Sequence, residues 1–113
     1  MNNGEIWLID LNPTIGAEIQ KIRPAIIVSN NAIGLLPLKV IVPITDWKAH
    51  YAKVPWMVKL TPNTENTLRK ISGADTFQVR SVSQQRFVRQ LGKIDDETMR
   101  RLKEGLKLVF DID

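Results

Sequence analysis

The order of hydrophobic and polar positions along the chain predicts a series of short strands followed by one helix. Residues 6–11 and 25–29 are nearly continuous apolar runs rich in Ile, Val and Trp, as in strands that are covered on both faces or closed into a small barrel. Residues 38–45 form a third apolar run, in which Pro43 indicates a sheet edge, a bulge or a barrel rim. We therefore expect the first half of the chain to be β-structure.

The second half continues with strand patterns and short polar connections. Residues 54–60 alternate between apolar and polar side chains, and residues 71–82 form a further strand region in which alternate residues face opposite ways. Ser83 is expected to cap a single helical turn at 84–86, and residues 87–94 return as a last strand.

The end of the chain has a helical pattern. Asp95 is a good N-cap, and the two acidic residues after it suit the positive end of a helix dipole. Apolar residues then recur every three or four positions, at Met99, Leu102, Leu106 and Val109. Five to seven short strands followed by one packed helix make an α+β fold built on a small barrel. We expect a single domain over residues 1–113.

Composition restricts the chemistry that this chain can perform. It has no cysteine and a single histidine, His50, which excludes thiolate metal sites and argues against a zinc site built from histidines. Neither a membrane-spanning run nor a signal-peptide pattern is apparent, so we expect a soluble cytoplasmic protein.

The charge is modestly positive and unevenly distributed. The net charge is +4, and residues 57–113 contain eleven basic and eight acidic residues, against five and four in residues 1–56. This excess is compatible with a nucleic-acid or acidic-protein partner and equally with an ordinary solvated surface.

The connection between the first two apolar runs, residues 12–24, is longer than a tight hairpin requires, and long loops held by rigid strands often carry function. At its end Arg23 precedes Pro24, which favours an extended backbone at the arginine. Arg23 is therefore expected at the start of a strand, where its guanidinium is available to a phosphate.

Four segments of the chain form a recognisable series: the opening GEIWLIDLNPTIGAEIQKIRPAIIVSNN, then VIVPIT, FQVRSVS and GKIDDETMRRLKEGLKLVF. In these motifs and their order the chain resembles the MazF/PemK (Kid) family of bacterial toxins, which are sequence-specific endoribonucleases. The resemblance covers nearly the whole chain, and its motifs are far more specific than a short pattern.

The resemblance implies an SH3-like β-barrel with a C-terminal α-helix, assembled as a homodimer. It implies metal-independent cleavage of single-stranded RNA (mRNA) without a cofactor, in which the ribose 2′-hydroxyl attacks the adjacent phosphorus. The products would be a 2′,3′-cyclic phosphate and a 5′-hydroxyl. The family also implies a partner, an antitoxin whose acidic tail blocks the RNA site.

Two residues match the family's catalytic pair. Arg23 in the Arg-Pro motif would stabilise the charge that develops on the phosphorane, and Thr45 would bind a phosphate oxygen or orient the 2′-hydroxyl. From the residues alone, Arg23 could equally form a surface ion pair, and Thr45 could be a strand-end residue selected for β-propensity.

Six further residues are candidates for binding RNA. The first loop supplies Glu18, Gln20 and Lys21, and the family's Q-x-[RK]-[ST] segment supplies Gln78 and Arg80. Trp47 would stack on an unpaired base or pack against the barrel, and Tyr51 and His50 follow it. For the candidates in 18–21, a solvated flexible loop without contact to RNA accounts equally well for the pattern.

The sequence departs from the family at one position. Phe77 stands where many relatives have an acidic residue, and the Kid branch assigns a catalytic role to an aspartate there. Asp75, expected on the same strand face as Phe77, is not given that role. The alternative function is a non-catalytic binding module on the same barrel, similar to the CcdB toxins that trap DNA gyrase.

Overall fold

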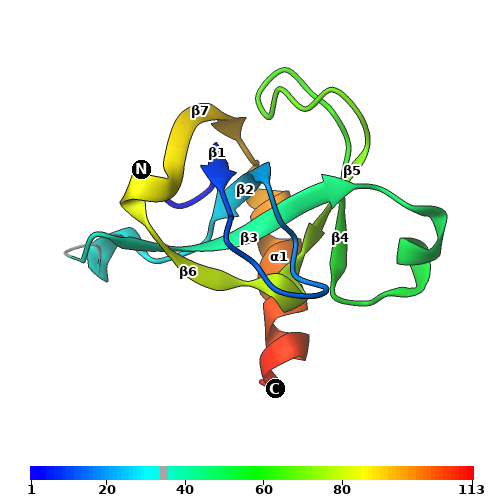
Figure 1. Cartoon of the computed structure of the whole chain (residues 1–113). Helices are drawn as coiled ribbons and strands as arrows, with labels where there is room; N and C mark the ends of the chain where they lie inside the picture. The colour runs from blue at the N-terminus through cyan, green and yellow to red at the C-terminus, as the bar shows by residue number, and fades with distance from the viewer. Residues whose placement is uncertain (34–35) are drawn as a thin grey trace.

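The computed structural model describes residues 1–33 and 36–113. Its elements are β1 (Glu5–Asp10), β2 (Ile22–Ile27), η1 (Asn31–Ile33), β3 (Leu38–Asp46), η2 (Ala49–Lys53), β4 (Met57–Leu60), β5 (Ser72–Asp75), η3 (Thr76–Gln78), β6 (Arg80–Ser83), η4 (Gln84–Arg86), β7 (Phe87–Lys93) and α1 (Asp96–Phe110), where η denotes a 3₁₀ helix. The expected α+β fold with a C-terminal helix is confirmed (Figure 1).

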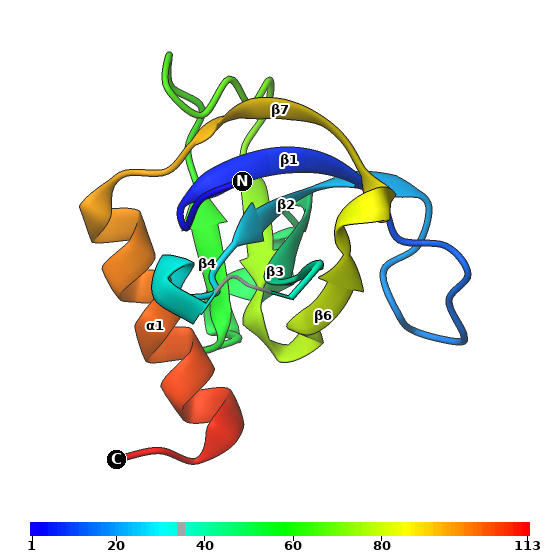
Figure 2. The ribbon, with the colours of Figure 1, turned by 90° about the vertical axis from the view of Figure 1, so that its left-hand side faces the viewer.

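All strand pairs of the sheet are antiparallel, and β3 is its central strand. Six of the seven strands follow the order β4-β5-β3-β2-β1-β7, and the seventh, β6, pairs with the first part of β3. Figure 2 shows β7 and β1 arching over β2 and β3, while α1 lies along one side of the sheet. In the described residues the two end strands, β4 and β7, do not pair with each other, so hydrogen bonds do not close this barrel-like sheet.

Pro43 does not mark a sheet edge. It is buried in the middle of β3, where it lies opposite Ala25 of β2. On the other side of β3 the partner changes at this point, from β6, which ends its pairing at Ile41, to β5, which begins at Ile44. The missing N–H of proline therefore falls where β3 changes partner, and no pairing with β5 or β6 is interrupted.

Two of the expected strands are shorter than the alternation predicted. Strand β4 contains only the last part of 54–60, because Val54 closes the 3₁₀ helix η2 by donating its backbone N–H to Tyr51 O. The expected strand over 71–82 is divided by η3, which the carboxylate of Asp75 caps by accepting the Phe77 N–H. The expectation that Phe77 shares a strand face with Asp75 is therefore wrong.

The predicted cap turns and the apolar stripe of the helix are confirmed. Ser83 Oγ accepts the Gln85 N–H at the start of η4, and the Asp95 carboxylate accepts the Thr98 N–H at 2.8 Å. Leu102 of α1 is fully buried in a core cluster with residues of β1, β2, β3, β4 and β5. A second cluster fills the other face of β2 and β3 and includes Leu11, Ala25 and Ile41. In the part of the chain described, no helix has the length and apolar character to cross a membrane.

Candidate RNA-binding site

The predicted long connection between β1 and β2 is closed tightly at its base. Leu11 N–H donates to Lys21 O at 3.0 Å, and Lys21 N–H donates to the Asn12 side-chain oxygen at the same distance. The guanidinium of Arg86 donates to the carbonyl oxygens of Asp10 and Asn12. Residues 12–21 therefore form a loop whose two ends are hydrogen-bonded to each other, and whose first end is also bound by Arg86.

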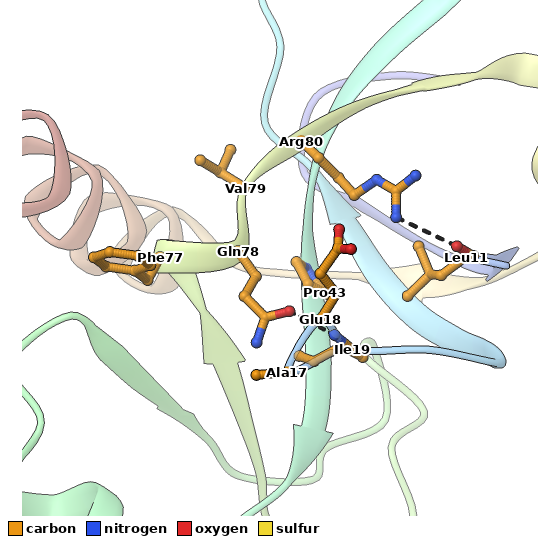
Figure 3. A pocket seen from close by; sticks show the side chains of 9 residues that line it. All are labelled: Leu11, Ala17, Glu18, Ile19, Pro43, Phe77, Gln78, Val79 and Arg80. Atoms are coloured by element: carbon orange, nitrogen blue, oxygen red, sulfur yellow. Dashed lines mark hydrogen bonds between the residues drawn. The ribbon is translucent and has the colours of Figure 1, made fainter. Parts of the chain in front are cut away.

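This loop forms one wall of a cavity of about 540 Å³ (Figure 3). The segment 17–19 faces the segment 77–80 across an apolar floor that includes Leu11 and Pro43. The complete lining is Leu11, Ala17, Glu18, Ile19, Pro43, Phe77, Gln78, Val79 and Arg80. A cavity with an apolar floor and a few polar groups on its wall suits a planar ligand such as a nucleobase.

Polar contacts across the cavity join its two walls. Ile19 N–H donates to Gln78 Oε1 at 2.6 Å, and Gln78 Nε2 donates to Asp75 at 3.2 Å. Arg80 Nη1 donates to Leu11 O at 3.3 Å. Gln78 thus fixes the β1–β2 loop to η3. The sequence motif indicated RNA binding by Gln78 and did not predict this contact.

Arg23 is half-buried at the start of β2 and lies opposite Ile9 of β1. Its Nε donates to Gln20 O at 3.4 Å, so the loop backbone contacts the guanidinium from one side. Within residues 1–33 and 36–113, Arg23 forms no ion pair. The alternative of a surface ion pair is therefore not seen, and the other guanidinium donors are available to an anion.

Thr45 is half-buried near the end of β3 and lies opposite Gly73 of β5. Pairing between β2 and β3 extends to Ala25 opposite Pro43. Because alternate residues of a strand project from the same face, Arg23 shares a face with Ala25, and Thr45 shares one with Pro43, a residue of the cavity floor. Arg23 and Thr45 therefore project from the same face of the sheet, each two residues beyond the Ala25–Pro43 pair.

The remaining loop candidates lie at different points around the cavity. Glu18 lines it and accepts the Ile15 N–H at 2.7 Å. Gln20 and Lys21 are exposed where the loop returns to β2, and Lys21 has a positive φ of 73°. Glu18 therefore faces the cavity together with Gln78 and Arg80, whereas Gln20 and Lys21 are placed beside Arg23.

Trp47 lies one residue beyond β3 and is half-buried. Its ring meets Tyr51 edge-on with centroids 5.6 Å apart, and His50 lies 4.6 Å from Tyr51. The tryptophan is therefore supported by packing while part of its surface stays accessible, a combination that permits stacking on a base.

Phe77 and Asp75 differ in their surroundings. Phe77 is 62% exposed at the cavity rim and lies 5.5 Å from the Trp56 ring. Both carboxylate oxygens of Asp75 accept hydrogen bonds, one from Phe77 N–H and one from Gln78 Nε2. This carboxylate caps η3 and fixes the amide of Gln78.

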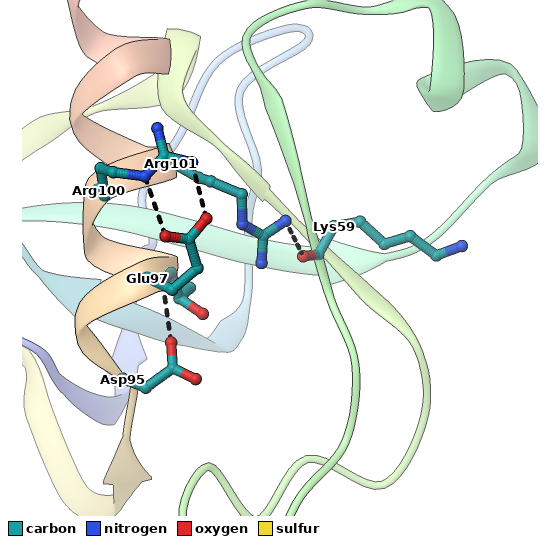
Figure 4. A network of polar contacts seen from close by, with 6 residues as sticks. Lys59, Asp95, Glu97, Arg100 and Arg101 are labelled. Atoms are coloured by element: carbon teal, nitrogen blue, oxygen red, sulfur yellow. Dashed lines mark hydrogen bonds and ion pairs between the residues drawn. The ribbon is translucent and has the colours of Figure 1, made fainter.

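Figure 4 shows Asp95, Glu97 and Arg100 at the start of α1, and none of these residues lines the cavity. Hydrogen bonds from the side chain and backbone of Thr98 lower the pKa of Asp95, and the hydrogen bond from Arg100 lowers the pKa of Glu97. In the described part of the chain, no three His, Asp or Glu side chains converge as metal ligands.

Comparison with known proteins gives matches over almost the whole chain. Residues 2–110 match the family described as PemK-like, MazF-like toxin of type II toxin–antitoxin system. Endoribonuclease MazF9 of Mycobacterium tuberculosis is 34% identical over 99% of this chain and 98% of its own length.

Solved structures of similar fold include a toxin alone and an endoribonuclease with its antitoxin. A crystal structure of MazF from Deinococcus radiodurans superposes with a TM-score of 0.83 at 22% identity, covering 99% of this chain and 97% of that one. An endoribonuclease in complex with its cognate antitoxin, from a mycobacterial species, gives a TM-score of 0.78 at 19% identity, covering 100% and 97% of the two chains.

Proposed function

Because this chain belongs to the PemK-like, MazF-like toxins of type II toxin–antitoxin systems, we propose that it is an endoribonuclease that cleaves single-stranded mRNA without a metal ion or cofactor. A relative of nearly equal length that is named an endoribonuclease supports this assignment. The observation that carries it is that Arg23 and Thr45 project from the sheet face that also bears Pro43, which lines a cavity that suits a base. The entire activity is assigned to one domain.

The proposed reaction is an internal transfer at phosphorus. The ribose 2′-oxygen forms a bond to the adjacent phosphorus and loses its proton, while the bond from phosphorus to the 5′-oxygen breaks. The leaving oxygen gains a proton, which yields a 2′,3′-cyclic phosphate and a 5′-hydroxyl. No external nucleophile or redox partner is needed.

Arg23 is proposed to stabilise the transition state electrostatically. Negative charge gathers on the non-bridging oxygens as the phosphorane forms, and a guanidinium with free donors binds that charge more tightly than it binds the starting diester. Because a guanidinium carries N–H donors and no acceptor, Arg23 acts as a donor to the oxygens and not as the base. Thr45 supplies a hydroxyl that binds a phosphate oxygen or orients the 2′-hydroxyl.

RNA is proposed to lie along the loop and the cavity. Lys21 pairs with a phosphate, Gln20 reads a base edge, and the cavity accepts one base between the loop and η3. Polar groups at the edge of that cavity, on Glu18, Gln78 and Arg80, discriminate between bases. Trp47 stacks on another base beyond Thr45.

We also propose the assembly and location that such a toxin requires. A cognate antitoxin binds this chain and blocks the RNA site, as suggested by the structure of a similar endoribonuclease with its antitoxin. A homodimer would cover exposed apolar side chains at the end of α1, where Leu108 is 59% and Phe110 is 57% exposed. Its substrate places the protein in the cytoplasm.

The test is cleavage of a long single-stranded RNA by the purified full chain in the presence of EDTA. We expect discrete fragments from the wild type and a rate at least roughly 100-fold lower for Arg23→Ala, with partial activity for Arg23→Lys. Arg69→Ala changes an exposed arginine outside the site and should match the wild type. Intact RNA together with growth arrest by this chain would favour the gyrase-poison alternative.

A further inference from the structure

Thr45 belongs to a row of paired positions that crosses β3, β5 and β4. In the pairing of β3 with β5, Thr45 lies opposite Gly73, and in the pairing of β5 with β4, Gly73 lies opposite Lys59. Residues opposite one another in antiparallel strands project from the same face of the sheet. Lys59 therefore projects from the same face as Thr45, two strands away.

The middle position of this row has no side chain, and other groups cover it. A Cβ on Gly73 would lie 3.0 Å from Met57 Sδ and 3.3 Å from Trp47 Cε3. The Trp47 ring thus lies over the gap that glycine leaves between Thr45 and Lys59. Replacing Gly73 by a larger residue would displace that ring.

The ammonium group of Lys59 lies over the Trp47 ring and forms no ion pair with an acidic side chain of the described residues. Its Nζ lies 5.4 Å from the ring centroid. The carbonyl oxygen of Lys59 accepts a 3.1 Å hydrogen bond from Arg101 of α1, which fixes the backbone of β4. Figure 4 shows the Lys59 side chain extending away from α1.

We propose that Lys59 binds a phosphate of the RNA adjacent to the scissile one, next to the base that stacks on Trp47. This inference rests on the proposed endoribonuclease function. Neighbouring strands lie about 4.8 Å apart, so the Lys59 backbone is roughly 10 Å from that of Thr45 across β5. With its ammonium group at Trp47, Lys59 meets the phosphodiester chain beyond the phosphate that Arg23 and Thr45 contact.

A lysine beside an aromatic ring suits single-stranded RNA for a physical reason. The ring offers a surface to any base, and the ammonium group offers a point charge to the phosphate that follows it. The row thereby extends the binding path from the β1–β2 loop across β3, β5 and β4. Its contribution is to binding, whereas Arg23 acts on the reacting atoms.

The test compares the wild type with Lys59→Gln on an RNA that contains deoxyribose at the scissile step. Binding is measured against salt concentration, and steady-state cleavage is measured on normal RNA. We expect weaker binding and a salt slope reduced by about 0.7, the value for one lost phosphate contact on a single strand. Turnover at saturating RNA should stay within about twofold of the wild type, while KM rises.

Two variants make the result specific. Lys59→Arg keeps the charge and should retain the wild-type salt slope. Lys103→Gln removes an equal charge from an exposed position on α1, near Asn3 and Asn31, and should leave binding unchanged. The thermal midpoint of each variant verifies that it is folded.

An unchanged salt slope for folded Lys59→Gln would overturn the inference, as would an equal loss with Lys103→Gln. These outcomes are separate from failure of the proposed function. If the wild type does not cleave RNA and Arg23→Ala changes nothing, the nuclease assignment fails. If Arg23-dependent cleavage holds while Lys59→Gln binds as the wild type does, only the assignment of Lys59 fails.

Discussion

The backbone N–H of Ile19 donates a 2.6 Å hydrogen bond to Oε1 of Gln78, and this contact joins the β1–β2 loop to the turn η3. Asp75 holds the other end of the same amide, so the loop is anchored through Gln78 to the end of β5. Loop and turn are 59 residues apart in sequence, yet together they form the cavity. Their positions are therefore coupled.

Removing the Gln78 side chain should weaken RNA binding more than it slows the cleavage step. In Gln78→Ala the loop loses its hydrogen bond to η3, and we expect the Ile19 amide to exchange faster with deuterium. A hydrogen bond worth about 1 kcal/mol corresponds to a roughly fivefold rise in KM for RNA. Gln85→Ala, at an exposed position of η4, is the control. Unchanged exchange at Ile19 would contradict the anchoring role.

Thr45 offers a test of the hydroxyl at the end of β3. Thr45→Ala should lower the turnover rate by about tenfold to 100-fold without preventing folding, because a phosphate or 2′-hydroxyl contact is lost. Thr45→Ser keeps the hydroxyl and should recover most of the rate. Equal losses in both variants would indicate that the methyl group or the strand packing matters instead.

Gly92 of β7 should tolerate no side chain. A Cβ there would collide with the backbone carbonyl of Glu65 and approach Asn66. Because backbone atoms cannot rotate away, Gly92→Ala should lower the free energy of unfolding by about 1–3 kcal/mol, measured with denaturant. Lys93→Ala, at the exposed next position, should have a much smaller effect. Wild-type stability for Gly92→Ala would contradict this close approach.

The helix cap should give stability a pH dependence. Thr98 lowers the pKa of Asp95 below its ordinary value of 3.8, so the folded state favours the carboxylate. The contribution is complete above that value and declines as the pH falls through the lower folded-state pKa. Asp95→Ala should therefore lower Tm by roughly 3–6 °C at pH 7. The difference should shrink in acid, and a constant difference down to pH 2 would contradict the electrostatic part.

The sequence predicted those elements whose signals are local. Asp95 and the apolar spacing identified α1. Ser83 identified the turn η4, which begins at the next residue. Alternation failed at Phe77, because the Asp75 carboxylate and the buried hydroxyl of Thr76, which donates to Trp56 O, favour a turn over a continued strand. Such contacts join residues up to 20 positions apart and leave little trace in a periodic pattern.

The candidate site likewise has a part that the sequence predicted and a part that it did not. Arg23 is identifiable because it precedes a proline in a recognisable motif, and Thr45 because it ends an apolar run. That both project from the same face of the sheet depends on the register between β2 and β3, which neither segment encodes alone. The part played by Arg86 in clamping the loop was not predicted, because its partners are carbonyl oxygens 74 and 76 residues away.

The most direct test of the central claim replaces one ribose by deoxyribose at a mapped cleavage step of an RNA substrate. If the 2′-oxygen is the nucleophile and Arg23 stabilises its attack, the wild type should bind this RNA normally and leave that single step uncut. Unmodified RNA should yield a 2′,3′-cyclic phosphate and a 5′-hydroxyl. Cleavage at the deoxyribose step would contradict the account, because it requires another nucleophile.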